Sequence, residues 1–168
     1  MNPSPGKDFE DRLRTRLKGV RRLAIIGIGD EFIPADSLGM HAAREIEKIG
    51  FPAVKVFLAG TVPESVTGPI RRYRPDHVLM VDAADMSAGP GTLAIVEPGS
   101  IEANLFSTHY FPLSVVMEYL EQDEGTKVTL VGIQPDNEVH CDGLSPPERK
   151  GLRHLIDSLT DILGSRHS

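Results

Sequence analysis

Three side chains in this sequence have the types and positions to share one divalent cation. Asp36 follows the apolar run at residues 23–29, Asp82 lies in the run at residues 77–83, and His109 precedes a later helical pattern. Mixed oxygen and nitrogen ligands suit zinc, nickel, iron or manganese better than Cu(I). Three protein ligands also leave coordination positions open for substrate or water, as at catalytic metal sites. The three residues are therefore our candidate set for metal binding and catalysis.

Each of the three residues also has a simpler interpretation when it is taken alone. Asp82 ends an apolar run, and a buried carboxylate needs hydrogen bonds, a cation or a metal; bonds to loop amides would meet that need. Asp36 or Ser37 could cap the helix expected at residues 38–49, and capping is a frequent use of aspartate before a helix. A single loop histidine such as His109 is more often structural or solvated. The residues alone leave these alternatives open.

The elements that must position these side chains alternate along the chain. Strands are expected at residues 23–29, 53–60, 77–83, 92–98 and 127–135, and helices at residues 38–49, 63–74, 112–122 and 147–163. Continuous apolar runs are typical of strands that are covered on both faces, as in parallel sheets. We therefore predict an α/β fold: a three-layer open sheet, mainly parallel, with helices on both faces.

Polar residues gather where the predicted strands end. In open α/β sheets, ligands bind outside the carboxyl ends of the strands. The polar residues at or just after the ends of the first, third and fifth strands are Asp30, Glu31, Asp36, Asp82, Asp85, Gln134 and Asp136. This edge of the sheet is the expected place of the site.

The chain is expected to form one α/β domain over residues 22–168, preceded by a polar arm at residues 1–21. Within the arm, Phe9, Leu13 and Leu17 recur every four residues, a spacing that predicts an amphipathic helix. We find no internal repeat and no interdomain linker.

Composition excludes several classes of protein. The 168 residues are 40% apolar and 25% charged, as in an ordinary globular domain. No apolar run reaches the roughly 18–20 residues that span a bilayer, and the first twenty residues lack the apolar core of a signal peptide. A single cysteine allows no internal disulfide, and a net charge of −6 does not favour nucleic acid as a partner. We expect a cytoplasmic protein that binds no nucleic acid and does not insert into membranes.

Common catalytic motifs do not explain the sequence. Gly27 and Gly29 begin a dinucleotide-binding pattern, but position 32 is phenylalanine and the second strand ends in Gly60 instead of an acidic residue. Phosphate-binding loops of the form GxxxxGK[ST], GxSxG nucleophile elbows and HExxH zinc motifs are absent. His140-Cys141-Asp142 is most simply an incidental local trio.

The order of several short motifs resembles that of the hydrogenase maturation endopeptidases. The branch that processes formate-hydrogenlyase-type hydrogenases is the most similar, and the resemblance covers about residues 22–165. The matching segments are GIGDEFIPADSLG (27–39), LMVDAADM (79–86), GPG (89–91), Thr108-His109 and GIQPD (132–136). One departure is visible: the acidic pair common in the family's first loop is replaced by Ala35-Asp36, after Pro34.

The resemblance implies roles for the candidate residues. Asp36, Asp82 and His109 match the family's metal ligands, and Asp36 and Asp82 are the implied catalytic carboxylates of an aspartyl-type endopeptidase. The implied substrate is the precursor of a [NiFe]-hydrogenase large subunit, from which a C-terminal extension is removed. Nickel would be presented by that precursor, so no tightly held cofactor is expected. We also expect a monomer.

Two other classes of function stay open. The chain could be a binding-only relative that docks the precursor without cutting it, which the altered first loop would suit. It could also be an unrelated metal-dependent hydrolase of a small molecule on a similar sheet.

Overall fold

The computed structural model describes residues 4–97, 110–138 and 143–165, with the backbone alone at residues 110–112. Its elements in chain order are α1 (Pro5–Arg16), β1 (Leu23–Ile28), η1 (Pro34–Asp36), α2 (Leu38–Ile49), β2 (Val54–Gly60), η2 (Pro63–Val66), α3 (Thr67–Tyr73), β3 (His77–Ala83), β4 (Leu93–Val96), α4 (Tyr110–Glu121), β5 (Lys127–Ile133) and α5 (Pro146–Gly164).

The strands form one sheet in the order β2-β1-β3-β5-β4. The first four strands in that order run parallel, and β4 runs antiparallel to β5 at the edge. A parallel return needs a crossover of about a dozen or more residues, usually with a helix. The connection at residues 84–92 contains no helix, so β4 returns in the opposite direction. The predicted α/β fold with a mainly parallel sheet is confirmed.

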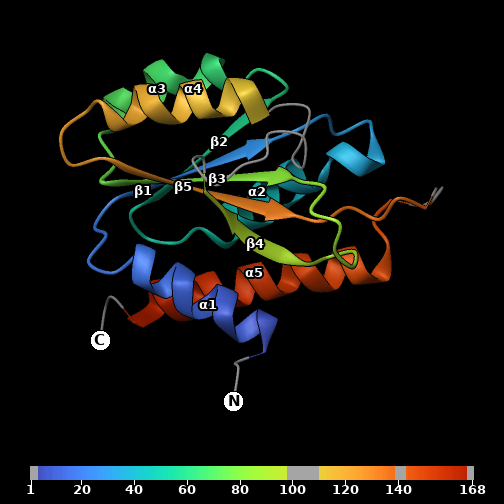
Figure 1. Cartoon of the computed structure of the whole chain (residues 1–168). Helices are drawn as coiled ribbons and strands as arrows, with labels where there is room; N and C mark the ends of the chain where they lie inside the picture. Colours follow the sequence, from blue (N-terminus) through green and yellow to red (C-terminus); the bar gives the residue numbers. More distant parts are fainter. Residues whose placement is uncertain (1–3, 98–109, 139–142, 166–168) are drawn as a thin grey trace.

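Helices cover both faces of the sheet, as Figure 1 shows, with α3 and α4 on one side and α1 and α5 on the other. Side chains alternate along each strand. On β1, Leu23 and Ile25 pack with α1, α2 and α5, whereas Ala24 and Ile26 pack with α3 and α4. Because β1 is covered on both faces, all six of its residues, Leu23–Ile28, are buried, which explains the continuous apolar run there. Within the described ranges, no helix combines the length and apolarity needed to cross a membrane.

The N-terminal segment contributes to the same core. Phe9, Leu13 and Leu17 are buried, and they belong to the cluster that includes residues of α5. The rings of Phe9 and His154 meet edge to face, with centroids 6.2 Å apart. The predicted amphipathic helix is thus present as α1, and its apolar stripe packs against the α/β domain.

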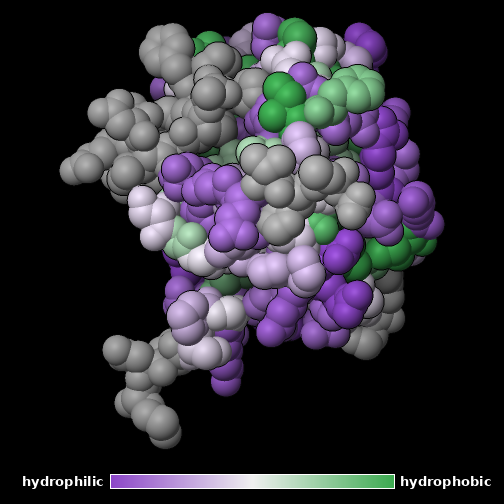
Figure 2. Space-filling view, turned by 90° about the vertical axis from the view of Figure 1, so that its right-hand side faces the viewer, coloured by the Kyte–Doolittle hydropathy of each residue, from purple (hydrophilic) through white to green (hydrophobic). Residues whose placement is uncertain are grey.

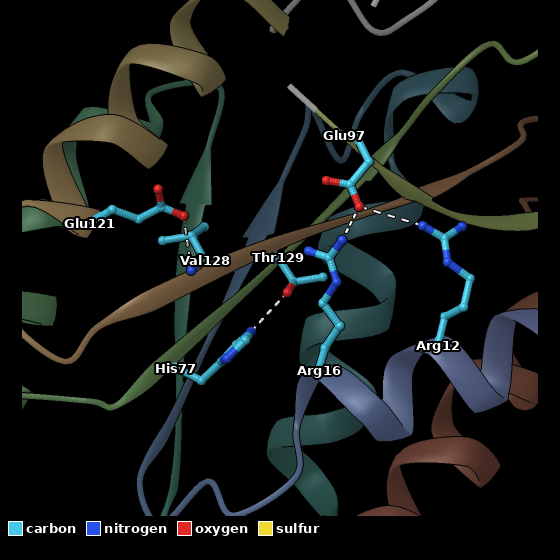
Figure 3. Close-up of polar contacts among 7 residues, drawn as sticks. All are labelled: Arg12, Arg16, His77, Glu97, Glu121, Val128 and Thr129. Atoms are coloured by element: carbon cyan, nitrogen blue, oxygen red, sulfur yellow. Dashed lines mark hydrogen bonds and ion pairs between the residues drawn. The ribbon is translucent and has the colours of Figure 1, made fainter. Parts of the chain in front are cut away.

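Ion pairs also join α1 to the edge strand. Arg12 and Arg16 both reach Oε1 of Glu97, the residue that follows β4 (Figure 3). All three side chains are partly exposed, so these pairs contribute little individually to the free energy of unfolding. They show that the second half of α1 lies beside the end of β4.

A buried histidine lies at the start of β3. His77 is 2% exposed, and its Nε2 lies 2.8 Å from the Thr129 hydroxyl on β5 (Figure 3). Burial disfavours the charged ring and lowers the pKa of His77 to about 4, with a further lowering by the nearby charge of Arg16. The neutral ring is therefore the native form.

His77 should make folding sensitive to acid. Its pKa is lower in the folded than in the unfolded chain, so its contribution is fully present above about pH 6.5 and is lost as pH falls toward 4. We expect a loss of about 3 kcal/mol over this window. Urea unfolding between pH 7 and 4 should show a flatter pH dependence for His77→Gln. If His77→Gln showed the same dependence of stability on pH as wild type, His77 would not be the group responsible. His41→Gln is the control, because His41 is exposed.

Candidate active site at the carboxyl ends of the strands

Asp82 is a buried carboxylate on a central strand. It is 2% exposed and pairs in register with Gly132 of β5. Alternation places it on the same face as Val78 and Met80, which pack with α3 and α4. Gly132 has no side chain, and the space above it is filled by Ala84, Val96 and Met86: a Cβ there would lie 2.9 Å from the Ala84 Cβ. The Asp82 carboxylate is therefore desolvated and lies on a closely packed strand.

Asp36 ends η1, in the loop between β1 and α2, and is partly buried. Its Oδ2 accepts a hydrogen bond of 3.0 Å from the Asp30 amide. Gly29 has φ +128°, and a Cβ there would lie 1.9 Å from the Asp36 carbonyl oxygen, so only glycine fits. Ser37, not Asp36, is the N-cap residue of α2. The helix-capping interpretation of Asp36 is therefore wrong, and its carboxylate instead binds the loop backbone.

The first turn of α2 brings the two carboxylates to one edge. A Cβ on Gly39 would lie 2.2 Å from the Val81 carbonyl oxygen and 2.3 Å from that of Ile28. The helix backbone therefore rests directly on the ends of β1 and β3. Asp36 lies three residues before this contact, and Asp82 directly follows Val81. The predicted placement of both residues at the carboxyl edge is confirmed.

His109 lies outside the described residues, as do residues 140–142. Helix α4 begins at the next residue, Tyr110, and ends at Glu121, whose carboxylate accepts a bond of 3.3 Å from the Val128 amide near the start of β5 (Figure 3). Because α4 runs opposite to β5, it begins toward the carboxyl edge. In the part of the chain that the structure describes, no group of three or more metal-binding side chains is present. The ligand role of His109 stays a prediction.

Gln134 holds the loop that follows Asp82. It is 1% exposed, and its Oε1 accepts bonds from the amides of Met86 (2.6 Å) and Ala88 (3.4 Å). Its Nε2 donates to Oδ1 of Asp85 at 3.3 Å. Two of the polar residues predicted at this edge, Asp85 and Gln134, are thus in contact. Their role in the described structure is to order the β3–β4 connection.

Two residues that order the loops near the candidate site, Glu148 and Gly151, were not among the predicted site residues. Glu148 is 4% exposed and accepts bonds from the amides of Ser145 (2.8 Å) and Asp136 (3.1 Å). The Ser-x-x-Glu spacing is a capping-box signature, so this contact could have been found in the sequence. In contrast, a Cβ on Gly151 would lie 2.3 Å from the Gly91 carbonyl oxygen. No local sequence pattern indicates this close approach of α5 to the loop before β4.

The fold and the site define an α/β protein with an acidic site at the carboxyl edge of a mainly parallel sheet. The chain belongs to the hydrogenase maturation protease family, whose model matches residues 40–162. It is therefore a peptidase. The matched span contains Asp82 and His109, and Asp36 lies just before it.

Individual relatives agree with this family. The Hydrogenase 3 maturation protease of Escherichia coli K12 is 41% identical over 113 residues, covering 67% of this chain and 72% of that protein. A protein of Methanocaldococcus jannaschii, which its name places provisionally among hydrogenase maturation proteases, is 31% identical over 163 residues, covering 92% and 96%. The crystal structure of the [NiFe] hydrogenase maturation protease HycI from Thermococcus kodakarensis KOD1 superposes with a TM-score of 0.78 at 28% identity, covering 91% of this chain and 99% of that one.

Proposed function

We propose that this protein is the endopeptidase that removes the C-terminal extension from the nickel-loaded precursor of a [NiFe]-hydrogenase large subunit. The observation that carries the proposal is the pair Asp36 and Asp82, which lie at one sheet edge in a chain of the hydrogenase maturation protease family. The Asp82 carboxylate is buried on β3, and the Asp36 carboxylate accepts a hydrogen bond from the Asp30 amide.

The two environments support a nickel-dependent reaction. Desolvation makes the negative charge of Asp82 costly, so a cation delivered to this edge would be bound favourably. The proposed ligands are Asp36, Asp82 and His109, and a precursor without nickel would lack this contact. A cation near the scissile carbonyl polarises it or lowers the pKa of a bound water.

Peptide hydrolysis also needs a proton acceptor. Attack by water on the scissile carbonyl forms a C–O bond and breaks the C–N bond, while one proton leaves the water and one reaches the departing amine. Asp36 and Asp82 are the proposed carboxylates for this transfer, as in an aspartyl-type peptidase. Asp36 is the more accessible of the two to water, because it lies on a partly exposed loop.

Intact mass of a purified, nickel-loaded precursor after incubation with this protein tests the proposal. We expect one new C-terminal fragment and a correspondingly shortened large subunit. A stable complex with an unchanged precursor mass would instead indicate the binding-only relative. Hydrolysis of small esters or peptides, with no response to the precursor, would indicate an unrelated hydrolase.

We further propose that the protein acts as a cytoplasmic monomer. We also propose that it holds no tightly bound cofactor, because nickel arrives with the substrate. Metal analysis of the purified protein should then find far less than one metal ion per chain. A stoichiometric metal that survives dialysis against a chelator would contradict this part of the proposal.

A further inference from the structure

An exposed phenylalanine lies beside the candidate active site. Phe32, in the loop between β1 and η1, is 94% exposed, and its neighbour Ile33 is 51% exposed. Val62, between β2 and η2, is 46% exposed. We call Phe32, Ile33 and Val62 the edge patch. Figure 2 views this edge and shows hydrophobic residues among mainly hydrophilic ones.

Several hydrogen bonds order the loop that carries Phe32. The Phe32 amide donates to Oδ1 of Asp30 at 2.9 Å, and the Ile33 amide donates to the Asp30 carbonyl at 3.2 Å. Glu31 forms two bonds of 2.6 Å with Arg44 of α2, and these bonds lower the pKa of Glu31. The backbone thus presents Phe32 to solvent before any partner binds, which reduces the entropic cost of docking.

The second loop of the edge patch lies next to the first. The Gly29 amide donates to the Gly60 carbonyl at 2.8 Å, which joins the ends of β1 and β2. The Ser65 hydroxyl donates to the Val62 carbonyl at 2.6 Å and fixes the turn after β2. Phe32 and Ile33 therefore lie on one ordered loop and Val62 on an adjacent one, at the same edge of the sheet as Asp36.

Asp30 connects the edge patch to the candidate active site. Its side chain accepts from the Phe32 amide, while its own amide donates to Asp36. Through Asp30, the Phe32 backbone is two hydrogen bonds away from the Asp36 carboxylate, so a peptide that binds at Asp36 lies near the loop that carries Phe32. Glu31 is paired with Arg44 and Asp36 is a proposed nickel ligand, so the Asp30 carboxylate remains as an acidic group at this rim. The rim therefore favours a peptide with basic rather than acidic neighbours around its apolar side chain.

We propose that the edge patch docks an apolar side chain of the hydrogenase precursor, within a few residues of the scissile bond and next to basic residues. This proposal rests on the proposed function and adds a specificity-determining contact to it. Covering Phe32 on binding would bury apolar surface that the folded protein leaves in water.

Kinetics of processing with Phe32→Ser, Phe32→Leu and Ile49→Ser test the docking contact. Ile49 is the matched control, because it is 49% exposed but ends α2 at the opposite edge of the sheet. We expect Phe32→Ser to raise KM for the nickel-loaded precursor roughly tenfold or more, with kcat nearly unchanged. Phe32→Leu should recover most of the loss, and Ile49→Ser should match wild type. All three should keep the wild-type melting temperature.

The outcomes separate the two proposals. If wild type cleaves the precursor and Phe32→Ser has an unchanged KM, the docking contact is wrong and the proposed function stands. If wild type cleaves nothing, both proposals fail. Sedimentation of wild type and Phe32→Ser gives the remaining outcome. Self-association that is lost in the variant, with KM unchanged, would show that a second copy covers the edge patch and would overturn the proposal.

Discussion

Replacing Asp82 with asparagine is expected to lower the rate of precursor cleavage about 100-fold or more. Asparagine keeps the shape of the side chain but removes its negative charge. The buried carboxylate, 2% exposed on β3, would then neither attract nickel nor accept a proton. Single-turnover cleavage of nickel-loaded precursor, followed by intact mass, measures this rate directly. Circular dichroism should show that the variant is folded.

Asp76→Asn is the matched control for this change. Asp76 lies at the opposite edge of the sheet, where its carboxylate accepts bonds of 2.7 and 2.6 Å from the amides of Arg21 and Arg22. Its loss should weaken the fold modestly and leave the cleavage rate intact. Cleavage at the wild-type rate by Asp82→Asn, or equal losses in the two variants, would contradict a catalytic or metal-binding role for Asp82.

Gly39→Ala is expected to destabilise the protein by about 3 kcal/mol or more. Alanine is the better helix former by about 1 kcal/mol, so helix propensity alone predicts the opposite sign. The added Cβ would lie 2.2 Å and 2.3 Å from two backbone carbonyl oxygens, which cannot rotate away. Relief requires α2 to move off the sheet, and that movement exposes buried residues such as Ala42 and Ile46.

Gly164→Ala tests the packing explanation, because Gly164 is also helical and a Cβ there meets nothing within 4 Å. Urea unfolding should find this variant equal to or slightly more stable than wild type. Gly39→Ala should also cleave precursor more slowly at temperatures where it remains folded, since the same movement displaces Asp36. Wild-type stability of Gly39→Ala would show that α2 does not rest on the strand ends as described.

The regular elements were predictable because their signals are local. The helix expected at residues 38–49 is α2, and the strand expected at residues 77–83 is β3. Residues 63–74 divide into η2 and α3, because Pro69 is accommodated in the first turn of a helix but not in its interior. The direction of β4 was not predictable from its apolar residues, since strand pairing depends on the length and path of the connection.

The candidate site was predictable only in part. The rule that ligands bind at the carboxyl ends of parallel strands placed Asp36 and Asp82 together. The contact that achieves this, Gly39 against Ile28 and Val81, joins residues far apart in the sequence and has no local signature. The exposure of Phe32 runs against the expectation that large apolar residues are buried, so only the structure could show it.

The most direct test of nickel-dependent cleavage at the Asp36–Asp82 edge compares precursor with and without nickel. Intact mass would be recorded after incubation of each precursor with wild-type protein and with Asp36→Asn. We expect a single C-terminal fragment from the nickel-loaded precursor with wild type alone. Equal cleavage of the nickel-free precursor, or full cleavage by Asp36→Asn, would contradict nickel-dependent cleavage at this edge.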